Sequence, residues 1–294
     1  MSSVKKAVIP AAGLGTRMLP ISCAVPKEML PIVDLPAVYY LVREAAESGI
    51  SDIQIITNRG KAAMEDFFDY APEYEAHLRR AGREEEIASL RRIADLARVT
   101  FVRQKEARGL GHAVLQTRAF VGDEPFVVLY GDDIIFSHTP VSRQLIDVYE
   151  EYGHPAAAVR AVSPALLSRY CSLKVGDPLR PGVYHCTDMI EKPKPGEEFS
   201  PLAILGRVLL TPAVFPILAT LAPGAGGEIQ LTDAMAALAR TEGMTALEFE
   251  GDRYDMGSKL GFLTANVVRG AAHEEVGAAF RAFLREFVAA MGED

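Results

Sequence analysis

The sequence predicts an α/β protein with a Rossmann-like, doubly wound sheet. Three observations lead to this prediction. Short apolar runs rich in β-branched residues recur along the chain, a helical pattern separates the first two, and one later run carries no polar residue at all. The 294 residues are 49% apolar and 24% charged, which is typical of a globular protein and excludes a disordered chain or a coiled coil.

The first two strands are expected at residues 7–9 and 53–57, where the apolar runs have strand length. A helix between them is indicated by apolar residues at helical spacing, which begin after Pro36 and stop before Gly49: Val38, Leu41, Val42 and Ala45. Strand, helix and strand together predict a βαβ unit.

The next strands are expected at residues 99–102 and 126–130. Because the second run is apolar on both faces, it is expected to be a central parallel strand covered on both sides. Residues 73–98 are densely charged, and the apolar stripe through part of them predicts a helix with a solvated face. More strands with fewer helices follow, which predicts a mixed extension of the sheet, at residues 156–162, 183–190, 203–210 and 245–249.

The C-terminal segment is predicted to be one amphipathic helix. Its apolar residues repeat at helical spacing: Phe280, Phe283, Leu284, Phe287, Val288 and Met291. This face either packs on its own domain or forms a subunit contact, and the sequence leaves both open. We divide the chain into an α/β domain over residues 1–264 and a C-terminal helical tail over residues 265–294.

The charges and the cysteines limit the class of protein. Lys and Arg total 31 against 39 for Asp and Glu, a net charge of −8 without a basic block, so nucleic acid is not an expected partner. No apolar stretch is long enough to predict a membrane span. Cys23, Cys171 and Cys186 lack disulfide or C-x-x-C spacing, which favours reduced thiols and a cytoplasmic location. Because the net charge is negative, the overall field does not attract anions, and an anionic substrate would need cations or a metal placed locally at its site.

A glycine-rich turn follows the first strand, with the sequence Ala11-Ala12-Gly13-Leu14-Gly15-Thr16-Arg17. Glycines let backbone N–H groups approach a polyphosphate closely. The turn is not a Walker A loop, and it is not a Rossmann fingerprint because Met18 stands where a small residue is needed. Prolines at positions 20, 26 and 31 prevent a long helix, so we expect an extended loop that carries Arg17 and Lys27.

This turn and the later segment Pro26-Lys27-Glu28-Met29-Leu30-Pro31 resemble the signature of the sugar-1-phosphate nucleotidyltransferases, and specifically of their bacterial UTP-using branch. Further blocks extend the resemblance over residues 4–290. It implies a mixed sheet of the nucleotidyltransferase type, Mg²⁺ as cofactor, a homo-oligomer, and uridylyl transfer from UTP to glucose 1-phosphate. Two alternatives remain open: thymidylyl transfer to a sugar 1-phosphate, and a nucleotide-sugar-binding paralogue without catalysis.

The resemblance assigns the nucleotide site to backbone and polar groups at strand ends. Gln104 and Gly109 would face the pyrimidine, and Ala11, Ala12, Gly13 and Gly15 would cradle the phosphates. His112, judged from its own surroundings, is a helix cap or a core histidine. Arg17 and Lys27 would neutralise the leaving phosphates.

The resemblance assigns the metal to carboxylates. Asp132 follows the central strand, at the carboxyl edge where open α/β sheets bind ligands, and matches the magnesium ligand of the family. Asp255 matches a second metal carboxylate of related thymidylyltransferases, acting directly or through water.

The sugar site is implied by four further positions. Glu191 would accept hydrogen bonds from glucose hydroxyls, and Lys192 would bridge the two phosphates. Gly206 and Thr232 would complete the pocket, although Thr232 is equally suited to cap the helix that follows it. Cys171 departs from the family, which has glycine there, so either the backbone is displaced or the side chain fills part of the sugar pocket. We expect glucose 1-phosphate to remain the substrate but to bind less tightly than it would with glycine at this position.

Overall fold

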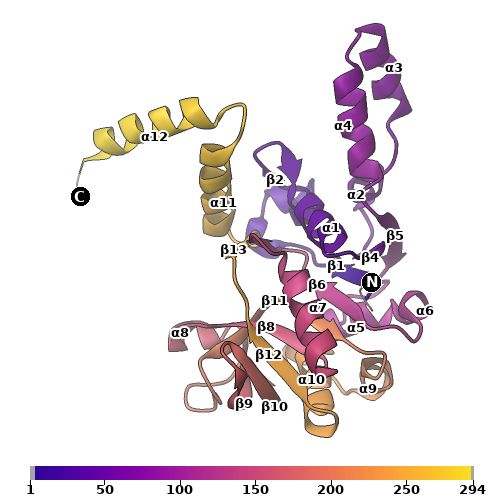
Figure 1. Cartoon of the computed structure of the whole chain (residues 1–294), viewed down its shortest axis with the longest axis vertical. Coiled ribbons are helices and arrows are strands. Elements are labelled where there is room, and N and C mark those ends of the chain that lie inside the picture. The colour runs from indigo at the N-terminus through magenta and orange to yellow at the C-terminus, as the bar shows by residue number, and fades with distance from the viewer. Residues whose placement is uncertain (1–3, 293–294) are drawn as a thin grey trace.

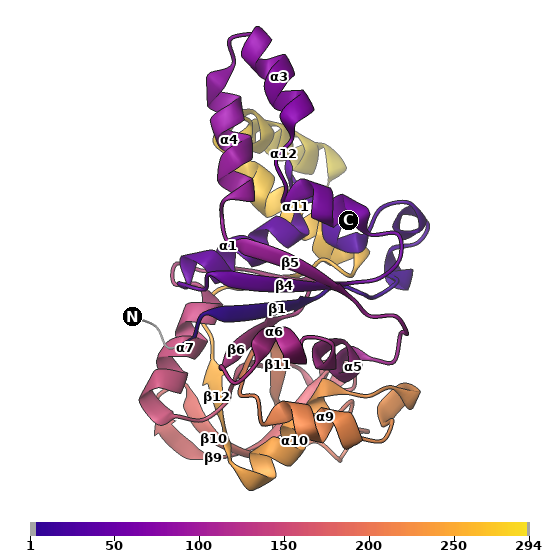
Figure 2. The ribbon, with the colours of Figure 1, turned by 90° about the vertical axis from the view of Figure 1, so that its right-hand side faces the viewer.

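The computed structural model describes residues 4–292, apart from the side chain of Ala225, and its framework is one mixed sheet (Figures 1 and 2). The sheet has nine strands, in the order β5 (Arg98–Arg103), β4 (Asp52–Thr57), β1 (Lys6–Pro10), β6 (Phe126–Leu129), β11 (Leu202–Leu210), β8 (Ala156–Ala161), β12 (Met244–Glu248), β10 (Val183–Glu191) and β9 (Cys171–Arg180). The first four are parallel, and β11 runs antiparallel to both its neighbours. The predicted mixed α/β sheet is therefore confirmed.

Helices cover both faces of this sheet. On one face lie α1 (Ala37–Glu47) and α7 (Val141–Tyr152), and on the other lie α5 (Leu110–Leu115), α9 (Val214–Thr220) and α10 (Leu231–Thr241). Shorter helices connect them: α2 (Ala62–Phe67), α6 (Arg118–Val121) and α8 (Pro164–Leu167). Two small antiparallel ribbons stand beside the main sheet, β2 (Pro31–Ile32) with β3 (Leu35–Pro36), and β7 (Asp133–Phe136) with β13 (Asp252–Asp255).

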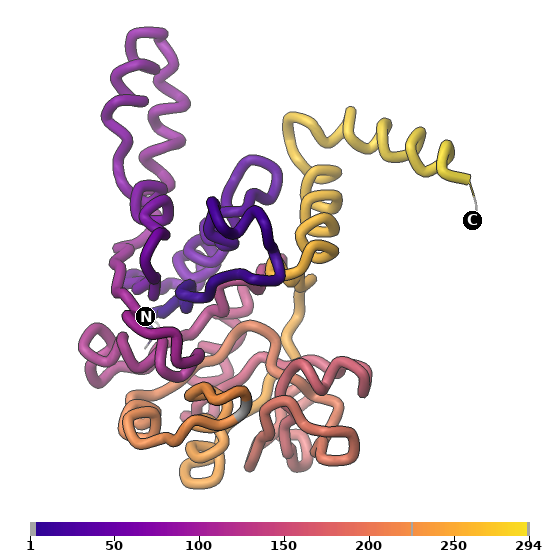
Figure 3. The backbone as a smooth tube through the Cα atoms, turned by 180° about the vertical axis from the view of Figure 1, so that it is seen from behind, coloured from indigo at the N-terminus to yellow at the C-terminus, as the bar shows by residue number. Residues whose placement is uncertain are grey.

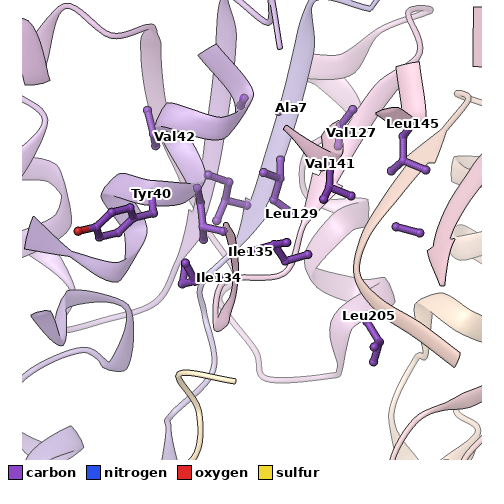
Figure 4. Close-up of a cluster of buried hydrophobic side chains, with 14 of the residues drawn as sticks. Ala7, Tyr40, Val42, Val127, Leu129, Ile134, Ile135, Val141, Leu145 and Leu205 are labelled. Carbon is purple, nitrogen blue, oxygen red and sulfur yellow. The ribbon is translucent and has the colours of Figure 1, made fainter. Parts of the chain in front are cut away.

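The core divides along the central strands, because successive strand residues point to opposite faces. Ala7 and Leu129 belong to the cluster under α1 and α7, which Figure 4 shows, whereas Val8 and Val128 belong to the cluster under α5, α9 and α10. All four side chains are completely buried. The prediction that the run at residues 126–130 is a strand covered on both faces is confirmed.

The charged stretch forms a helical hairpin that projects from the body (Figure 1). It consists of α3 (Pro72–Arg80) and α4 (Glu84–Ala94), separated by a turn at Gly82, where φ is +72°. Across the hairpin, Arg91 donates hydrogen bonds to both carboxylate oxygens of Glu75, at 2.8 and 3.1 Å. Only Leu78 and Ile87 among its apolar residues are buried, in agreement with the predicted solvated face.

The last two helices form an arm at the same end of the molecule (Figures 1 and 3). α11 (Lys259–Ala272) packs on β13 and β2, and α12 (Gly277–Met291) packs on α11. The expected boundary after residue 264 falls inside α11, so we propose to begin the tail at Lys259. The ends of the two expected domains, residues 1–3 and 293–294, lie outside the described residues.

The predicted amphipathic helix is present as α12, but its apolar face is not covered by the α/β domain. Phe283 is 55% exposed, Phe287 50% and Met291 65%. The alternative in which this face packs on its own domain is therefore wrong. Within residues 4–292, no helix is both long and apolar enough to cross a membrane.

Candidate active site

The loop after β1 folds into three short 3-10 helices, η1 (Thr16–Met18), η2 (Ile21–Cys23) and η3 (Lys27–Met29). Gly15 has a φ of +69° and brings the chain back onto Lys27, whose Cβ would lie 3.4 Å from a Cβ at Gly15. The prolines exclude a longer helix, as expected, but the loop is a series of tight turns and not the extended segment that the sequence predicted.

A buried lysine that the sequence analysis missed supports this loop from below. The Nζ of Lys61 donates to the carbonyl oxygens of Ala11 and Gly13 and to the Glu28 carboxylate, the last two at 2.8 Å. Burial raises the pKa of Glu28 and lowers that of Lys61, and each partner opposes the shift of the other. Lys61 follows β4 at the edge of the sheet where β1 also ends, and this position could have indicated that Lys61 belongs to the site.

The first cavity, of about 380 Å³, lies against the loop. Its walls include six of the residues assigned to nucleotide binding or phosphate contact: Ala12, Gly13, Lys27, Gln104, Gly109 and Asp132. Ala11 is completely buried behind this wall, with its carbonyl oxygen on Lys61. Neither Ala11 nor Gly15 lines the cavity, so their part in the site is to shape the loop.

Gln104 is held in one orientation. Its Nε2 donates to the Gly109 carbonyl oxygen at 3.1 Å and lies 3.0 Å from Nδ1 of His112. Both amide hydrogens are thereby directed to the protein, which leaves the amide oxygen as an acceptor. His112 lies inside α5 and is neither a cap nor a core residue; it orients Gln104, and its place one helical turn behind Gly109 was the missed signal.

The second cavity, of about 730 Å³, is continuous with the first, since Leu110, Tyr130 and Asp132 line both. It brings together seven of the residues assigned to the sugar, the phosphates and the metal: Arg17, Asp132, Cys171, Glu191, Lys192, Thr232 and Asp255. The two cavities therefore form one cleft along the ends of the central strands.

Glu191 and Thr232 meet in this second cavity. The Thr232 hydroxyl donates to Oε2 of Glu191 at 2.8 Å. The N-cap of α10 is Gln230, without a side-chain capping bond, so the alternative role of Thr232 as a helix cap is wrong. Lys192 lies beside this pair, with its Nζ 3.8 Å from Oε1 of Glu191.

Gly206 does not line the cavity. It has a φ of +82°, and a Cβ there would lie 2.6 Å from the Cβ of Asp133. Any other residue would displace the chain next to Asp132. Gly206 therefore acts on the site from behind, by letting β11 approach Asp133, the residue that follows Asp132.

Cys171 forms part of the cavity floor, but its thiol is directed at β11. The backbone N–H of Ile204 donates to the sulfur at 3.4 Å, and Cys171 is only 4% exposed. Burial raises the pKa of this thiol to about 12, so it is neutral. The side chain joins β9 to β11, and its sulfur is a buried hydrogen-bond acceptor in the wall of the pocket.

We therefore expect Cys171→Gly to act on stability. Loss of the buried acceptor for Ile204 should lower the free energy of unfolding by about 1–3 kcal/mol, measured by urea denaturation. Cys171→Ser keeps an acceptor and is the matched control. An unchanged free energy of unfolding in Cys171→Gly would contradict this expectation.

Two carboxylates and two cations face one another where the cavities meet. Lys27 Nζ lies 2.5 Å from Oδ2 of Asp132, and Arg17 reaches Asp132 at 3.4 Å and Asp255 at 3.1 Å. Burial favours a neutral Asp132, but Lys27 and Arg17 outweigh burial and hold its pKa below the usual value. Burial also opposes the charge of Lys27, yet Asp132 keeps its pKa raised. Both partners are charged at neutral pH.

The two carboxylates fit a magnesium ion whose remaining ligands are water molecules and phosphate oxygens. They converge over Gly257, where a Cβ would lie 2.6 Å from Oδ2 of Asp132 and 3.0 Å from Oδ1 of Asp255. No group of three His, Cys, Asp or Glu side chains within residues 4–292 is arranged to hold a metal. Mg²⁺ often takes only one or two carboxylates and completes its shell with water and phosphate oxygens, which suits this pair.

A mixed α/β sheet whose first strand leads into a glycine-rich loop with two cations, opposite two carboxylates in a two-part cleft, agrees with the nucleotidyl transferase class. The sequence model described as "Nucleotidyl transferase" matches residues 6–269. The chain belongs to this family and, within it, to the bacterial UTP–glucose-1-phosphate uridylyltransferases.

Three relatives illustrate the similarity. The UTP–glucose-1-phosphate uridylyltransferase YngB of Bacillus subtilis is 49% identical over 97% of this chain and 96% of its own. A UDP-glucose pyrophosphorylase solved with UDP-glucose is 40% identical, with a TM-score of 0.83 over 92% of this chain and all of its own. A UTP-bound enzyme from Acinetobacter baumannii is 36% identical, with a TM-score of 0.89; the match covers 96% of this chain and 99% of its own.

Proposed function

We infer that this protein transfers a uridylyl group from UTP to glucose 1-phosphate, giving UDP-glucose and pyrophosphate. The observation that carries this inference is the continuous cleft, in which a cavity on the phosphate loop opens into a polar cavity at Asp132. The relatives named UTP–glucose-1-phosphate uridylyltransferase, and those solved with UTP or with UDP-glucose, support it.

The first cavity takes the nucleotide. The free amide oxygen of Gln104 is an acceptor for the N3–H donor of uracil, whereas cytosine offers an acceptor at N3 and would leave both groups unpaired. Gly109 has a φ of +99°, and a Cβ there would lie 2.7 Å from the Ile229 carbonyl oxygen, so only glycine permits this wall. Ala12 and Gly13 leave room for the phosphates beside Lys27.

The second cavity takes the sugar phosphate. The Glu191 carboxylate has one oxygen on Thr232 and accepts from sugar hydroxyls with its remaining capacity. Lys192, whose side chain is 49% exposed, extends from the same strand end and bridges the attacking phosphate and the α-phosphate. Catalysis is then the placement of two anions against fixed cations.

No protein nucleophile takes part. A phosphate monoester has a second pKa of about 6, so an oxygen of glucose 1-phosphate is already ionised at neutral pH and attacks the α-phosphorus directly. The new P–O bond forms as the bond to the β-phosphate breaks, and pyrophosphate leaves. Lys27 and Arg17 stabilise the charge that accumulates on it.

Asp132 and Asp255 are the residues that would hold Mg²⁺. When bound, the ion supplies positive charge to the phosphate oxygens and orients them. Arg17 contacts both carboxylates, so its guanidinium would lie beside the ion and next to the phosphates.

The experiment is pyrophosphate release with each nucleoside triphosphate crossed with several sugar 1-phosphates, with and without Mg²⁺. We expect the highest kcat/KM with UTP and glucose 1-phosphate, and no pyrophosphate release without the metal. A preference for dTTP would establish thymidylyl transfer instead. Tight UDP-glucose binding without turnover would establish a non-catalytic paralogue.

We also propose that the protein is cytoplasmic. The three free thiols of Cys23, Cys171 and Cys186 accord with this location.

We also propose that the protein is a homo-oligomer and that a second copy covers the apolar face of α12. Phe283 and Phe287 stack on each other, with ring centroids 5.8 Å apart, and both are at least half exposed. Such a face is unfavourable in water when it is left uncovered.

The double variant Phe283→Glu and Phe287→Glu should therefore lower the mass measured by light scattering. Arg285→Glu on the other side of the helix is the matched control. An unchanged mass for the double variant would contradict the proposed contact.

A further inference from the structure

The backbone of Lys192 is held in a strained conformation. Its φ is +48°, in the left-handed region, which is unfavourable for a residue other than glycine and persists only where the surroundings impose it. The N–H of Lys192 donates to the carbonyl oxygen of Tyr170 at 2.7 Å. This bond extends the pairing of β9 and β10 by one residue beyond Cys171 and Glu191. The position of Lys192 therefore depends on Tyr170.

Tyr170 in turn is held by Arg253. The Nη1 of Arg253 donates to the Tyr170 hydroxyl at 3.1 Å, and the guanidinium lies 5.2 Å from the centre of the ring. The Nη2 of the same guanidinium lies 2.5 Å from Oδ1 of Asp133. The side chains of Arg253 and Asp133 are only 16% and 8% exposed, so water competes little for these contacts.

Asp133 is held in place by contacts of both its backbone and its side chain. Its carbonyl oxygen accepts from the buried Arg207 at 2.8 Å, and its side chain fills the space that Gly206 leaves. It directly follows Asp132, and it pairs with Asp255 where the β7–β13 ribbon ends. One guanidinium thus connects the end of the β7–β13 ribbon, next to Asp132 and Asp255, to the strand end that carries Lys192.

We propose that Arg253 is a positioning residue, which sets the place of Lys192 relative to Asp132 and Asp255 by holding Tyr170. The inference rests on the proposed function, because Lys192 is the group that bridges the two phosphates. Arg253 acts through the Tyr170 backbone. A displacement of about 1 Å in such a group can cost 10²-fold in rate without unfolding the protein.

The test is a double-mutant cycle between Arg253→Gln and Lys192→Ala. In the wild-type background, Arg253→Gln should lower kcat about 10²-fold. KM for UTP should change little, because neither residue lines the nucleotide cavity. With Lys192→Ala already present, Arg253→Gln should cost little more. Arg240→Gln is the matched control, since Arg240 pairs with Asp188 at 2.7 Å outside the cleft, and its kcat should equal that of the wild type.

Additive losses in the cycle would overturn the inference, because Arg253 would then act on the substrates independently of Lys192. A wild-type kcat for Arg253→Gln would overturn it as well. Tyr170→Phe provides a second test in case Arg253→Gln does not fold. It keeps the ring and the carbonyl, removes only the acceptor for Arg253, and should lower kcat at an unchanged Tm; a wild-type kcat in Tyr170→Phe would count against the inference.

Failure of the proposed function is visible separately. In that case the wild-type protein forms no pyrophosphate from UTP and glucose 1-phosphate. The same cycle is then measured by the affinity for UDP-glucose in titration calorimetry. Non-additive losses support the positioning role, and additive losses contradict it.

Discussion

Asp132→Asn is expected to remove nearly all turnover while the fold is retained. The carboxylate is the nearest partner of Lys27 and lies over Gly257 opposite Asp255. A neutral amide is a poor ligand for Mg²⁺, and the loss of preorganised charge in the cleft should lower kcat by about 10²–10³-fold. KM for UTP should not rise, because Lys27 and Arg17 are released from the carboxylate and remain available to the phosphates.

The measurement is steady-state pyrophosphate release as a function of the UTP and Mg²⁺ concentrations. Asp188→Asn is the matched control, because Asp188 is an aspartate in an ion pair with Arg240 outside the cleft. We expect this control to turn over like the wild type. A near-wild-type kcat for Asp132→Asn would remove Asp132 from the metal site.

Lys27→Ala is expected to have the second largest effect. Its Nζ is the cation nearest to Asp132, and the side chain is 16% exposed at the wall of the first cavity. Without it, the phosphates lose one preorganised charge, which corresponds to about 2.7–4 kcal/mol, or 10²–10³-fold in kcat. Burial would then raise the pKa of Asp132, because the main opposing charge is gone.

The control for this variant is Lys5→Ala, which removes a lysine that donates to the Gly49 carbonyl oxygen at the surface. We expect its kcat to be unchanged. If Lys27→Ala lowers Tm but not kcat, Lys27 supports the loop and does not act on the phosphates.

The sequence predicted most of the sheet because its central strands are buried on both faces. Uninterrupted apolar residues at the positions of β6 leave little alternative to a covered strand. β9 was missed because it is an edge strand. Seven of its ten residues are not buried, and Gly176 and Pro178 interrupt any pattern. β7 was missed because it has only four residues and begins with Asp133, directly after the turn at Gly131 and Asp132, so its apolar run is too short to predict a strand.

Some residues of the candidate site could likewise be predicted from the sequence, and others could not. Groups at strand ends, such as Asp132 and Lys192, could be placed because the fold fixes which edge they share. Lys61 and Glu28 could not be paired, because their contact spans 33 residues and only folding brings them together. His112 was misjudged for a related reason: its partner Gln104 lies on the loop after β5, outside the helix that carries His112.

We expect the cleft to hold both substrates at once, so that they react with each other directly. The most direct test is the formation of pyrophosphate from UTP and Mg²⁺ by the wild-type protein, with and without glucose 1-phosphate, together with exchange of labelled pyrophosphate into UTP. We expect pyrophosphate only when glucose 1-phosphate is present, and no exchange in its absence. Exchange with UTP alone would indicate a covalent uridylyl-enzyme and would contradict direct attack, as would the absence of pyrophosphate when both substrates are supplied.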